Sequence, residues 1–157
     1  MDDATSLAKH ANNRGVSRTL RDRFPYPYGL EDAKEFLARA TTGEGLERNY
    51  CIEVDGSAVG SIGLTIGEDV YRLSAEFGYW LGEELWGQGI MSEVVPAFVN
   101  YCFAKFSLKR MFASAYASNP ASARVLEKSG FVFEGRLHKS VIKDGQILDS
   151  LLYAKTK

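Results

Sequence analysis

Residues 75–98 read AEFGYWLGEELWGQGIMSEVVPAF. An apolar, strand-like run breaks here into Trp86-Gly87-Gln88-Gly89, and apolar residues then resume at helical spacing. Such a glycine turn between a strand and a helix is either a plain connection or a backbone cradle for an anion. Two glycines around one polar residue do not distinguish these interpretations by themselves, so the rest of the chain must decide between them.

The composition is typical of one globular domain. The chain has 157 residues, of which 45% are hydrophobic and 25% charged, and its net charge is −1. Single domains commonly have this size and balance, so we expect one domain over residues 1–157. The sequence contains no long basic run, and nucleic acid is therefore not an expected partner.

The sequence also lacks the signs of a membrane or secreted protein. No stretch approaches the roughly 18 apolar residues of a membrane span, and the first residues, MDDATSLAKHANN, do not resemble a signal peptide. We expect a soluble, cytoplasmic protein with no membrane partner. Cys51 and Cys102 fall in a predicted strand and on an apolar helix face, so both are expected to be buried free thiols. His10 and His138 are expected at the surface, and no metal site is predicted.

The first half of the chain predicts two helices and a hairpin. Residues 2–13 have acids at the start and asparagines at the end, as a helix does, and a second helix is expected between Leu30 and Gly43. The prolines of residues 24–30 indicate an extended segment between these helices. Residues 49–67 alternate as two strands joined by Asp55-Gly56, a dipeptide that favours a type I′ turn.

The second half predicts a strand–helix–strand unit, a further helix and a second hairpin. Residues 72–82 and 109–118 are the two strands of that unit, and Pro96 is expected to kink the helix between them. Asn119 as N-cap and Pro120 in the first turn open the next helix, which ends at Gly130, and two long strands follow around Asp144-Gly145. These patterns predict an α+β fold. The apolar stripe of the first of these helices comprises Ile90, Met91, Val94, Val95, Phe98, Val99, Cys102 and Phe106.

The glycine turn has the features of an anion site. A helix start leaves backbone N–H groups unpaired and carries partial positive charge. Gly87 and Gly89 would let a phosphate approach the amides of Gln88, Gly89, Ile90 and Met91 without meeting a Cβ. The turn is not a P-loop and not a dinucleotide fingerprint, because neither the GK[ST] nor the third glycine is present.

The strand before the turn points to the rest of the ligand. Gly78 and Gly82 interrupt it, and glycine within a strand often marks a bulge or a close approach of another chain. A strand splayed from its neighbour would expose amides and carbonyls to an extended ligand that itself contains amides. Pantetheine is such a ligand, and its pyrophosphate would then lie on the glycine turn.

Three stretches carry a resemblance to a known family. They are AEFGYWLGEELWGQGIMSE (75–93), SNPASARVLEKSGFVFEGRLHK (118–139) and RFPYPYGLEDAKEFL (23–37). With them the chain resembles, over residues 4–155, the Gcn5-related N-acetyltransferase (GNAT) superfamily, and within it the Rim-type group that acetylates the N-termini of ribosomal proteins. The resemblance implies a mixed, mostly antiparallel central sheet with a splayed strand pair, flanked by about four helices. The family normally begins with a short strand before its first helix, whereas this sequence opens directly at residues 2–13, so either that edge strand is absent or the sequence lacks a few residues at its start.

The resemblance also implies a co-substrate and its contacts. Acetyl-CoA would donate an acetyl group to a primary amine, and an N-terminal α-amine of a protein is the expected acceptor. Asn119 and Ser122 would lie near the thioester. Tyr79, Trp80 and Leu81 would run beside the pantetheine, and the pyrophosphate would be held by Trp86, Gly87, Gln88, Gly89, Ile90 and Met91.

The chemistry needs a proton acceptor, because an amine attacks a thioester only when it is neutral. Glu76 is the first candidate, acting through water, although it is equally read as a solvated strand residue. Ser122 is the candidate general acid that protonates the thiolate, and Tyr79 is the alternative. The purely structural interpretation of Ser122 is a serine in the first turn of a helix, and that of Tyr79 is a side chain packed on the sheet. Val141 occupies the position where some Rim-type relatives carry a glutamate base.

The residues allow more than one acceptor amine and more than one oligomeric state. Tyr26 and Tyr28 either line the acceptor pocket or cover the core. A polyamine- or aminoglycoside-type activity is the alternative, for which an acidic pocket would be expected. A coenzyme A-binding sensor without activity is the second alternative, favoured by Val141. The protein is expected to be a monomer or a homodimer. The acidic candidates for a polycation are Glu31, Asp32, Glu83 and Glu84.

Overall fold

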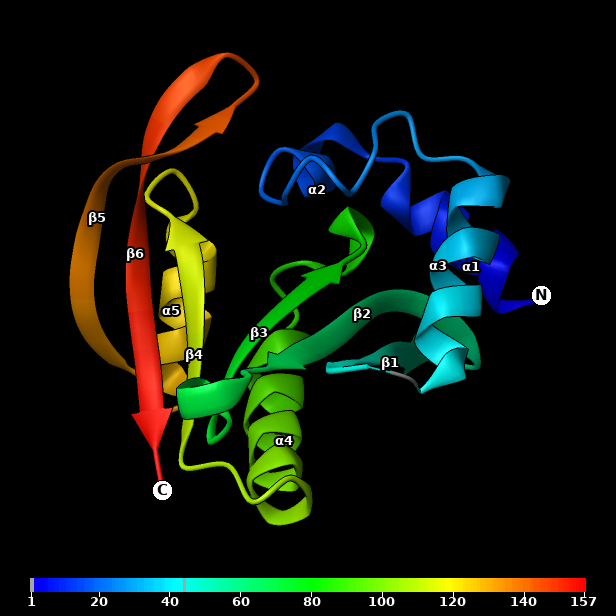
Figure 1. Cartoon of the computed structure of the whole chain (residues 1–157). Coiled ribbons are helices and arrows are strands. Elements are labelled where there is room, and N and C mark those ends of the chain that lie inside the picture. Colours follow the sequence, from blue (N-terminus) through cyan, green and yellow to red (C-terminus); the bar gives the residue numbers. More distant parts are fainter. Residues whose placement is uncertain (1, 44) are drawn as a thin grey trace. The chain divides into compact units, whose positions relative to one another are not determined.

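The computed structural model describes residues 2–43 and 45–157, which form helices and the strands of one sheet (Figure 1). The α-helices are α1 (Asp3–Ala11), α2 (Arg14–Ser17), α3 (Leu30–Thr42), α4 (Ile90–Lys105) and α5 (Pro120–Lys128). The strands are β1 (Glu47–Val54), β2 (Ser57–Ile66), β3 (Ser74–Leu81), β4 (Arg110–Tyr116), β5 (Val132–Lys143) and β6 (Gln146–Thr156). Two short 3-10 helices are η1 (Asp69–Tyr71) and η2 (Glu83–Leu85).

The sheet has the strand order β1-β2-β3-β4-β6-β5. β3 and β4 are parallel and are connected by α4, whereas β6 runs antiparallel to both β4 and β5. The predicted α+β class and the single strand–helix–strand unit are therefore confirmed. The described residues contain five α-helices where about four were expected, because the one-turn helix α2 has too few residues to show an apolar period.

The contacts within the chain divide it into two compact units that share β3. Unit 1 is Met1–Leu64 with Tyr79–Gln88, and unit 2 is Thr65–Gly78 with Gly89–Lys157. The register between β3 and β4 covers three residue pairs at the start of β3, from Ser74 opposite Arg110 to Glu76 opposite Phe112. Such a short parallel ladder is what the expected splay of this strand pair requires.

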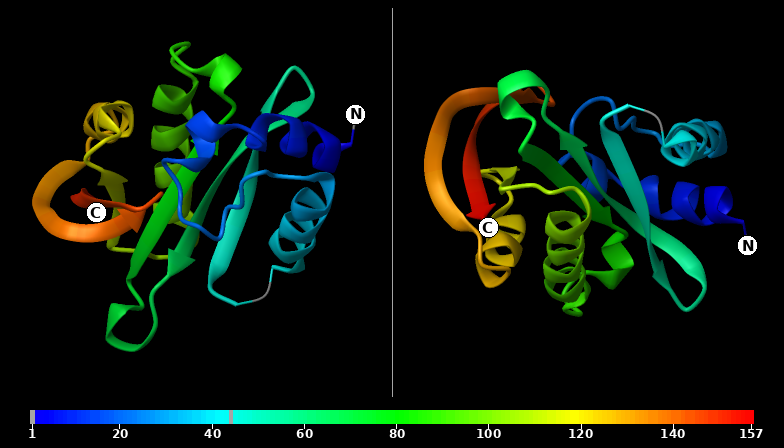
Figure 2. Two further views of the ribbon diagram at one scale, coloured as in Figure 1. Left: turned by 90° about the horizontal axis from the view of Figure 1, so that it is seen from above. Right: turned by 60° about the horizontal axis from the view of Figure 1, so that its bottom comes forward.

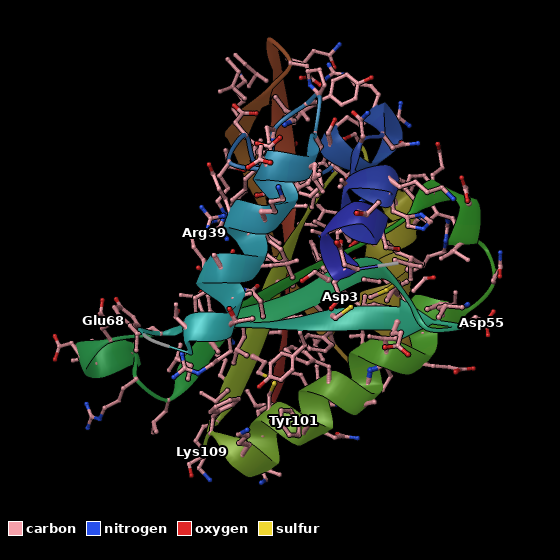
Figure 3. The ribbon with its side chains drawn as sticks, turned by 90° about the vertical axis from the view of Figure 1, so that its right-hand side faces the viewer. Asp3, Arg39, Asp55, Glu68, Tyr101 and Lys109 are labelled. Carbon is pink, nitrogen blue, oxygen red and sulfur yellow. The ribbon has the colours of Figure 1, made fainter. Side chains whose placement is uncertain are left out.

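In unit 1, α1 and α3 pack against each other beside the β1–β2 hairpin. Figure 3 labels Asp3 on α1, Arg39 on α3 and Asp55 at the turn of that hairpin. Both turn residues have positive φ, 50° at Asp55 and 75° at Gly56, which is the conformation that a type I′ turn needs. The core of this unit comprises Ala4, Leu7, Ala11, Tyr28, Ala33 and Ala58, with Phe24, Phe36, Leu37 and Trp80 packed against it.

In unit 2, the core lies between α4 and the strands. The Phe77 ring contacts the rings of Phe98 and Phe131, with centroids 6.4 and 5.2 Å apart. The predicted stripe of α4 is buried at Val95, Phe98, Val99 and Cys102, and Phe103, which was not predicted, is buried as well. Pro96 lies inside α4, which continues through it to Lys105. Figure 2 shows β5 and β6 as a long, curved hairpin, and β5 has register shifts at Phe133/Gly135 and Leu137/Val141.

Two local expectations were wrong or incomplete. Cys51 is exposed rather than buried, because Ile52 beside it takes the inward position of β1 and successive strand residues face opposite sides. Cys102 is buried as expected, and burial raises the pKa of its thiol to about 12. The proline segment contains bends and a cis Tyr26–Pro27 bond rather than a regular extended stretch.

None of the described helices is long and apolar enough to cross a bilayer. Residues 2–43 and 45–157 also contain no group of three or more His, Cys, Asp or Glu side chains arranged to hold a metal ion.

Candidate functional site

The start of α4 is the glycine turn that the sequence singled out. Gly89 is the N-cap of the helix, with a φ of 80°, and no side chain caps the helix start. Gly87 has a φ of 73°. A Cβ built on either glycine would meet no heavy atom within 4 Å. The first helical amides lack intrahelical acceptors and carry partial positive charge, so this turn has the chemistry of an anion site.

Side chains on the preceding loop hold this turn in place. The Trp86 indole Nε1–H donates to the Leu81 carbonyl at 2.8 Å, and the Gln88 side-chain amide donates to the Glu84 carbonyl at 3.2 Å. Both bonds lie within unit 1, and Gly89 is the first residue of the following unit 2 segment. The Gln88 side chain therefore braces the loop.

The second half of β3 is packed closely within unit 1. Gly60 on β2 has no room for a Cβ, because the Trp80 carbonyl oxygen lies against it. Leu81 is buried and Tyr79 half-buried. Gly78, inside β3, and Gly82, just after it, have different surroundings: a Cβ on Gly82 would lie 2.6 Å from Nδ1 of His10, whereas Gly78 has open space. The close approach suspected at both glycines is therefore present at Gly82 alone.

The candidate chemical groups of unit 2 lie on β3 and α5. Glu76 is half-buried and faces Phe112 in the parallel ladder. Asn119 is the N-cap of α5 as predicted, and its Oδ1 accepts from the Ser122 amide at 3.4 Å. The structure thus brings Asn119 and Ser122 together, and the Asn119 side chain already has a structural task. Ser122 itself is half-buried.

The two tyrosines of the proline segment have different environments. Tyr28 is only 6% exposed and belongs to the unit 1 core, with its ring centroid 4.9 Å from that of Phe24. Burial raises the pKa of its phenol. Tyr26 is 49% exposed, and the Arg14 guanidinium lies 5.3 Å from its ring centroid. These environments favour core covering for Tyr28 and leave Tyr26 available to an acceptor.

Both histidines were expected at the surface, which is correct for His138 but not for His10. His138 has 77% of its side chain exposed, as expected. His10 is half-buried with its ring against Gly82, because the last turn of α1 packs on the end of β3. No sequence signal marked this contact.

An aspartate that sequence reasoning missed organises the irregular part of β5. Asp149 on β6 accepts from the Lys139 amide at 2.8 Å, from Arg136 Nε at 2.6 Å, and contacts His138 Nδ1 at 3.2 Å. These donors, the Lys139 amide first, lower the pKa of Asp149 to about 2. Val141 ends this irregular stretch and pairs with Leu148.

Comparison with known proteins gives a consistent result. A profile of the acetyltransferase (GNAT) domain matches residues 1–132. The chain is 34% identical over 113 residues to the uncharacterized N-acetyltransferase YoaA of Bacillus subtilis (strain 168), covering 72% of this chain and 61% of that protein. It is 30% identical over 111 residues to the ribosomal-protein-serine acetyltransferase of Escherichia coli (strain K12), covering 71% and 62%. The match therefore spans about three fifths of the length of these relatives.

The fold has a close counterpart among solved structures. RimL, a ribosomal L7/L12 alpha-N-protein acetyltransferase in complex with coenzyme A, superposes with a TM-score of 0.87 at 22% identity, covering 99% of this chain and 90% of its own. This likeness concerns the path of the backbone and confirms the predicted architecture.

Proposed function

The chain belongs to the acetyltransferase (GNAT) family, and from this premise we propose that it transfers the acetyl group of acetyl-CoA to the N-terminal α-amine of a protein. We further propose that residues 1–157 act as one acetyltransferase domain. The resemblance to N-terminal acetyltransferases in the stretches 75–93 and 118–139 supports this choice of acceptor.

The observation that carries the proposal is the uncapped start of α4. Gly87 and Gly89 hold a left-handed backbone conformation with open space where a Cβ would be, and the helix N-terminus favours a negative group. The pyrophosphate would lie against Trp86, Gly87, Gln88, Gly89, Ile90 and Met91. Tyr79, Trp80 and Leu81 would contact the pantetheine, and Asn119 and Ser122 the thioester end.

The bound acetyl-CoA supplies an activated acetyl group, and the protein must manage protons and charge. Glu76 would accept a proton from the acceptor's ammonium group through a water molecule, which leaves a neutral amine to attack. A backbone amide of β3 would stabilise the oxyanion. The hydroxyl of Ser122, or alternatively that of Tyr79, would donate a proton to the departing sulfur.

Calorimetric titration with acetyl-CoA, followed by an acetylation assay, tests the proposal. The assay would offer peptides with unblocked N-termini, the same peptides with blocked N-termini, spermidine and an aminoglycoside. We expect binding, and transfer that depends on the unblocked N-terminus. Absence of binding would overturn the proposal entirely. Binding without transfer to any amine would indicate a coenzyme A sensor, and preferential acetylation of spermidine or the aminoglycoside would overturn the assigned acceptor.

A further inference from the structure

The charges of unit 1 are unevenly distributed. Residues 14–23, RGVSRTLRDR, contain four arginines and one aspartate, a net charge of +3 in a chain whose total is −1. They begin as α2 and continue into the loop before α3. We call residues 14–23 the basic segment. It had no place in the sequence-based interpretation of function.

The arginines of the basic segment lie on the surface. Arg14, Arg18, Arg21 and Arg23 are all exposed. Arg14 lies over the ring of Tyr26, and Arg23 forms an ion pair with Glu47 at 3.4 Å that is exposed on both sides. Exposed pairs of this kind hold their partners weakly. Within residues 2–43 and 45–157, Arg18 has no side-chain partner.

The basic segment is firmly attached beside the second half of β3. Asn13 caps α2 by accepting from the Val16 amide at 3.1 Å, and its Nδ2 donates to Glu83 Oε2 at 2.7 Å. At the other end of the segment, the Phe24 ring meets the Trp80 ring edge-on, with centroids 5.4 Å apart. All these contacts lie within unit 1. The residues that flank the segment, Asn13 and Phe24, therefore attach it to Glu83 and Trp80, and the proposed function assigns Trp80 to the pantetheine.

Four acidic side chains of the same unit have partners within the protein. Each of the four carboxylates that might have formed a pocket for a polycation has a partner within the protein. Glu31 pairs with Lys34 at 2.7 Å, Asp32 accepts from the Gly29 amide at 2.7 Å, Glu83 holds Asn13, and Glu84 lies 4.0 Å from Lys9. Two of these contacts, Glu31–Lys34 and Glu84–Lys9, are exposed pairs that hold their partners weakly. A polyamine would also have to approach the arginines, whereas an acceptor with carboxylates would meet complementary charge.

We propose that the basic segment selects acceptors that carry carboxylates close to the reacting amine, namely peptides whose N-terminal residue is followed by Asp or Glu. This inference rests on the proposed acetyl transfer and adds the charge of its acceptor. Arginine suits the task because its planar, permanently charged guanidinium donates two parallel hydrogen bonds to a carboxylate. The segment discriminates between acceptors by attraction to carboxylates and by repulsion of cationic side chains.

The test compares two peptides with the same N-terminal serine, one followed by acidic and one by basic residues. We expect kcat/KM to favour the acidic peptide, and added salt to reduce the preference because exposed charges are screened. Arg18→Glu should lower kcat/KM for the acidic peptide by about three- to tenfold, a size that corresponds to one exposed charge pair and its reversal. Arg124→Glu on α5, an exposed arginine in unit 2, makes the same change in net charge and should leave the preference intact.

The possible results separate this inference from the proposed function. If neither peptide nor any other amine is acetylated, the proposed function fails, and the inference fails with it. Equal use of both peptides, or a preference for the basic peptide or spermidine, overturns the inference alone. The affinity of each variant for acetyl-CoA, measured by calorimetry, provides the last criterion. A loss of that affinity in Arg18→Glu, with an unchanged preference between peptides, would assign the arginine to the coenzyme phosphates and overturn the inference.

Discussion

Two helices of unit 2 begin in opposite ways. α5 starts at Asn119, whose side chain accepts from the Ser122 amide at 3.4 Å, and Pro120 in its first position has no N–H to satisfy. α4 starts at Gly89, in the left-handed region and without a side-chain cap. The start of α5 therefore has a side-chain acceptor of its own, whereas the start of α4 has none.

The difference indicates which helix start has backbone N–H donors available for a ligand. A capped start is stable without help, since an N-cap side chain contributes about 1 kcal/mol. An uncapped start keeps its donors for another molecule, and a negatively charged ligand bound there would stabilise the folded protein in proportion to its concentration. The proposed pyrophosphate site is therefore at α4, while Asn119 serves α5 first.

The largest expected effect is on turnover and leaves the binding of acetyl-CoA at α4 unchanged. Glu76→Gln should lower kcat by roughly 10²- to 10⁴-fold, the usual contribution of general acid–base catalysis, because the amide does not accept the proton. Its affinity for acetyl-CoA should be unchanged. Steady-state kinetics and calorimetry on the same preparation provide the comparison. Normal turnover in this variant would remove Glu76 from the mechanism.

The next effect should fall on coenzyme binding alone. Gly89→Val forces a β-branched residue into a φ of 80° and projects its side chain across the anion path. Because the side chain would occupy the space that the anion needs, we expect acetyl-CoA to bind at least about tenfold more weakly, a loss of about 1.4 kcal/mol.

Gly145→Val is the matched control for this experiment. Gly145 has a φ of 74° and open space around a built Cβ, but it lies in the β5–β6 turn. The strain in the two variants should be similar, and their melting temperatures should fall together. Only the Gly89 variant should lose affinity. An equal loss of affinity in both variants would show that strain, rather than the position of the side chain, weakens binding.

A smaller effect is expected at the capped helix. Asn119→Ala should reduce the free energy of unfolding by about 1 kcal/mol, because the Ser122 amide loses its acceptor. Denaturant titration measures this change, and Asn119→Ser, which retains a capping oxygen, should restore most of it. A variant that keeps full stability but binds acetyl-CoA poorly would reverse the assignment of Asn119 from cap to ligand.

The smallest effect concerns a second place where the protein supplies its own acceptor. Asp149 satisfies the Lys139 amide, and its pKa is lowered from the ordinary value of 3.8 to about 2. A lowered pKa in the folded state means that the ionised carboxylate stabilises the fold above about pH 4 and that this contribution is lost as the pH falls toward 2.

The corresponding experiment follows melting temperature against pH for the parent and Asp149→Asn. Their difference should be constant from neutral pH to about pH 4 and should shrink between pH 4 and 2. A difference that is the same at pH 2.5 as at pH 7 would mean that packing, and not the charge of Asp149, stabilises this part of β5.

The hairpin turns show how far local sequence determines local structure. Asp55-Gly56 and Asp144-Gly145 were both predicted as turns, and all four residues have positive φ. Yet β2 after the first turn is buried along most of its length, whereas β5 before the second is mostly exposed. A dipeptide selects the turn because its backbone energies are local. Burial depends on which other elements cover the strand.

In the candidate site, too, the local sequence predicts some features, whereas others depend on residues that are distant along the chain. The glycines of the 86–89 turn, the Asn-Pro helix start and the α4 stripe were predictable, because φ preferences, capping and helical period are written in neighbouring residues. The exposure of Cys51, the core position of Tyr28 and the contact of His10 with Gly82 were not. Each depends on residues far away in the chain, and a strand or loop residue has no local signal that says which side will be covered.

The sequence by itself determined the order of strands and helices, both hairpin turns, the glycine start of α4 and the family resemblance that indicates acetyl-CoA. Only the tertiary structure decided that Glu31, Asp32, Glu83 and Glu84 have partners within the protein and that the arginines of residues 14–23 are exposed. The physical reason is that a charge becomes available or occupied through partners brought near it by folding, and most of those partners are distant along the chain.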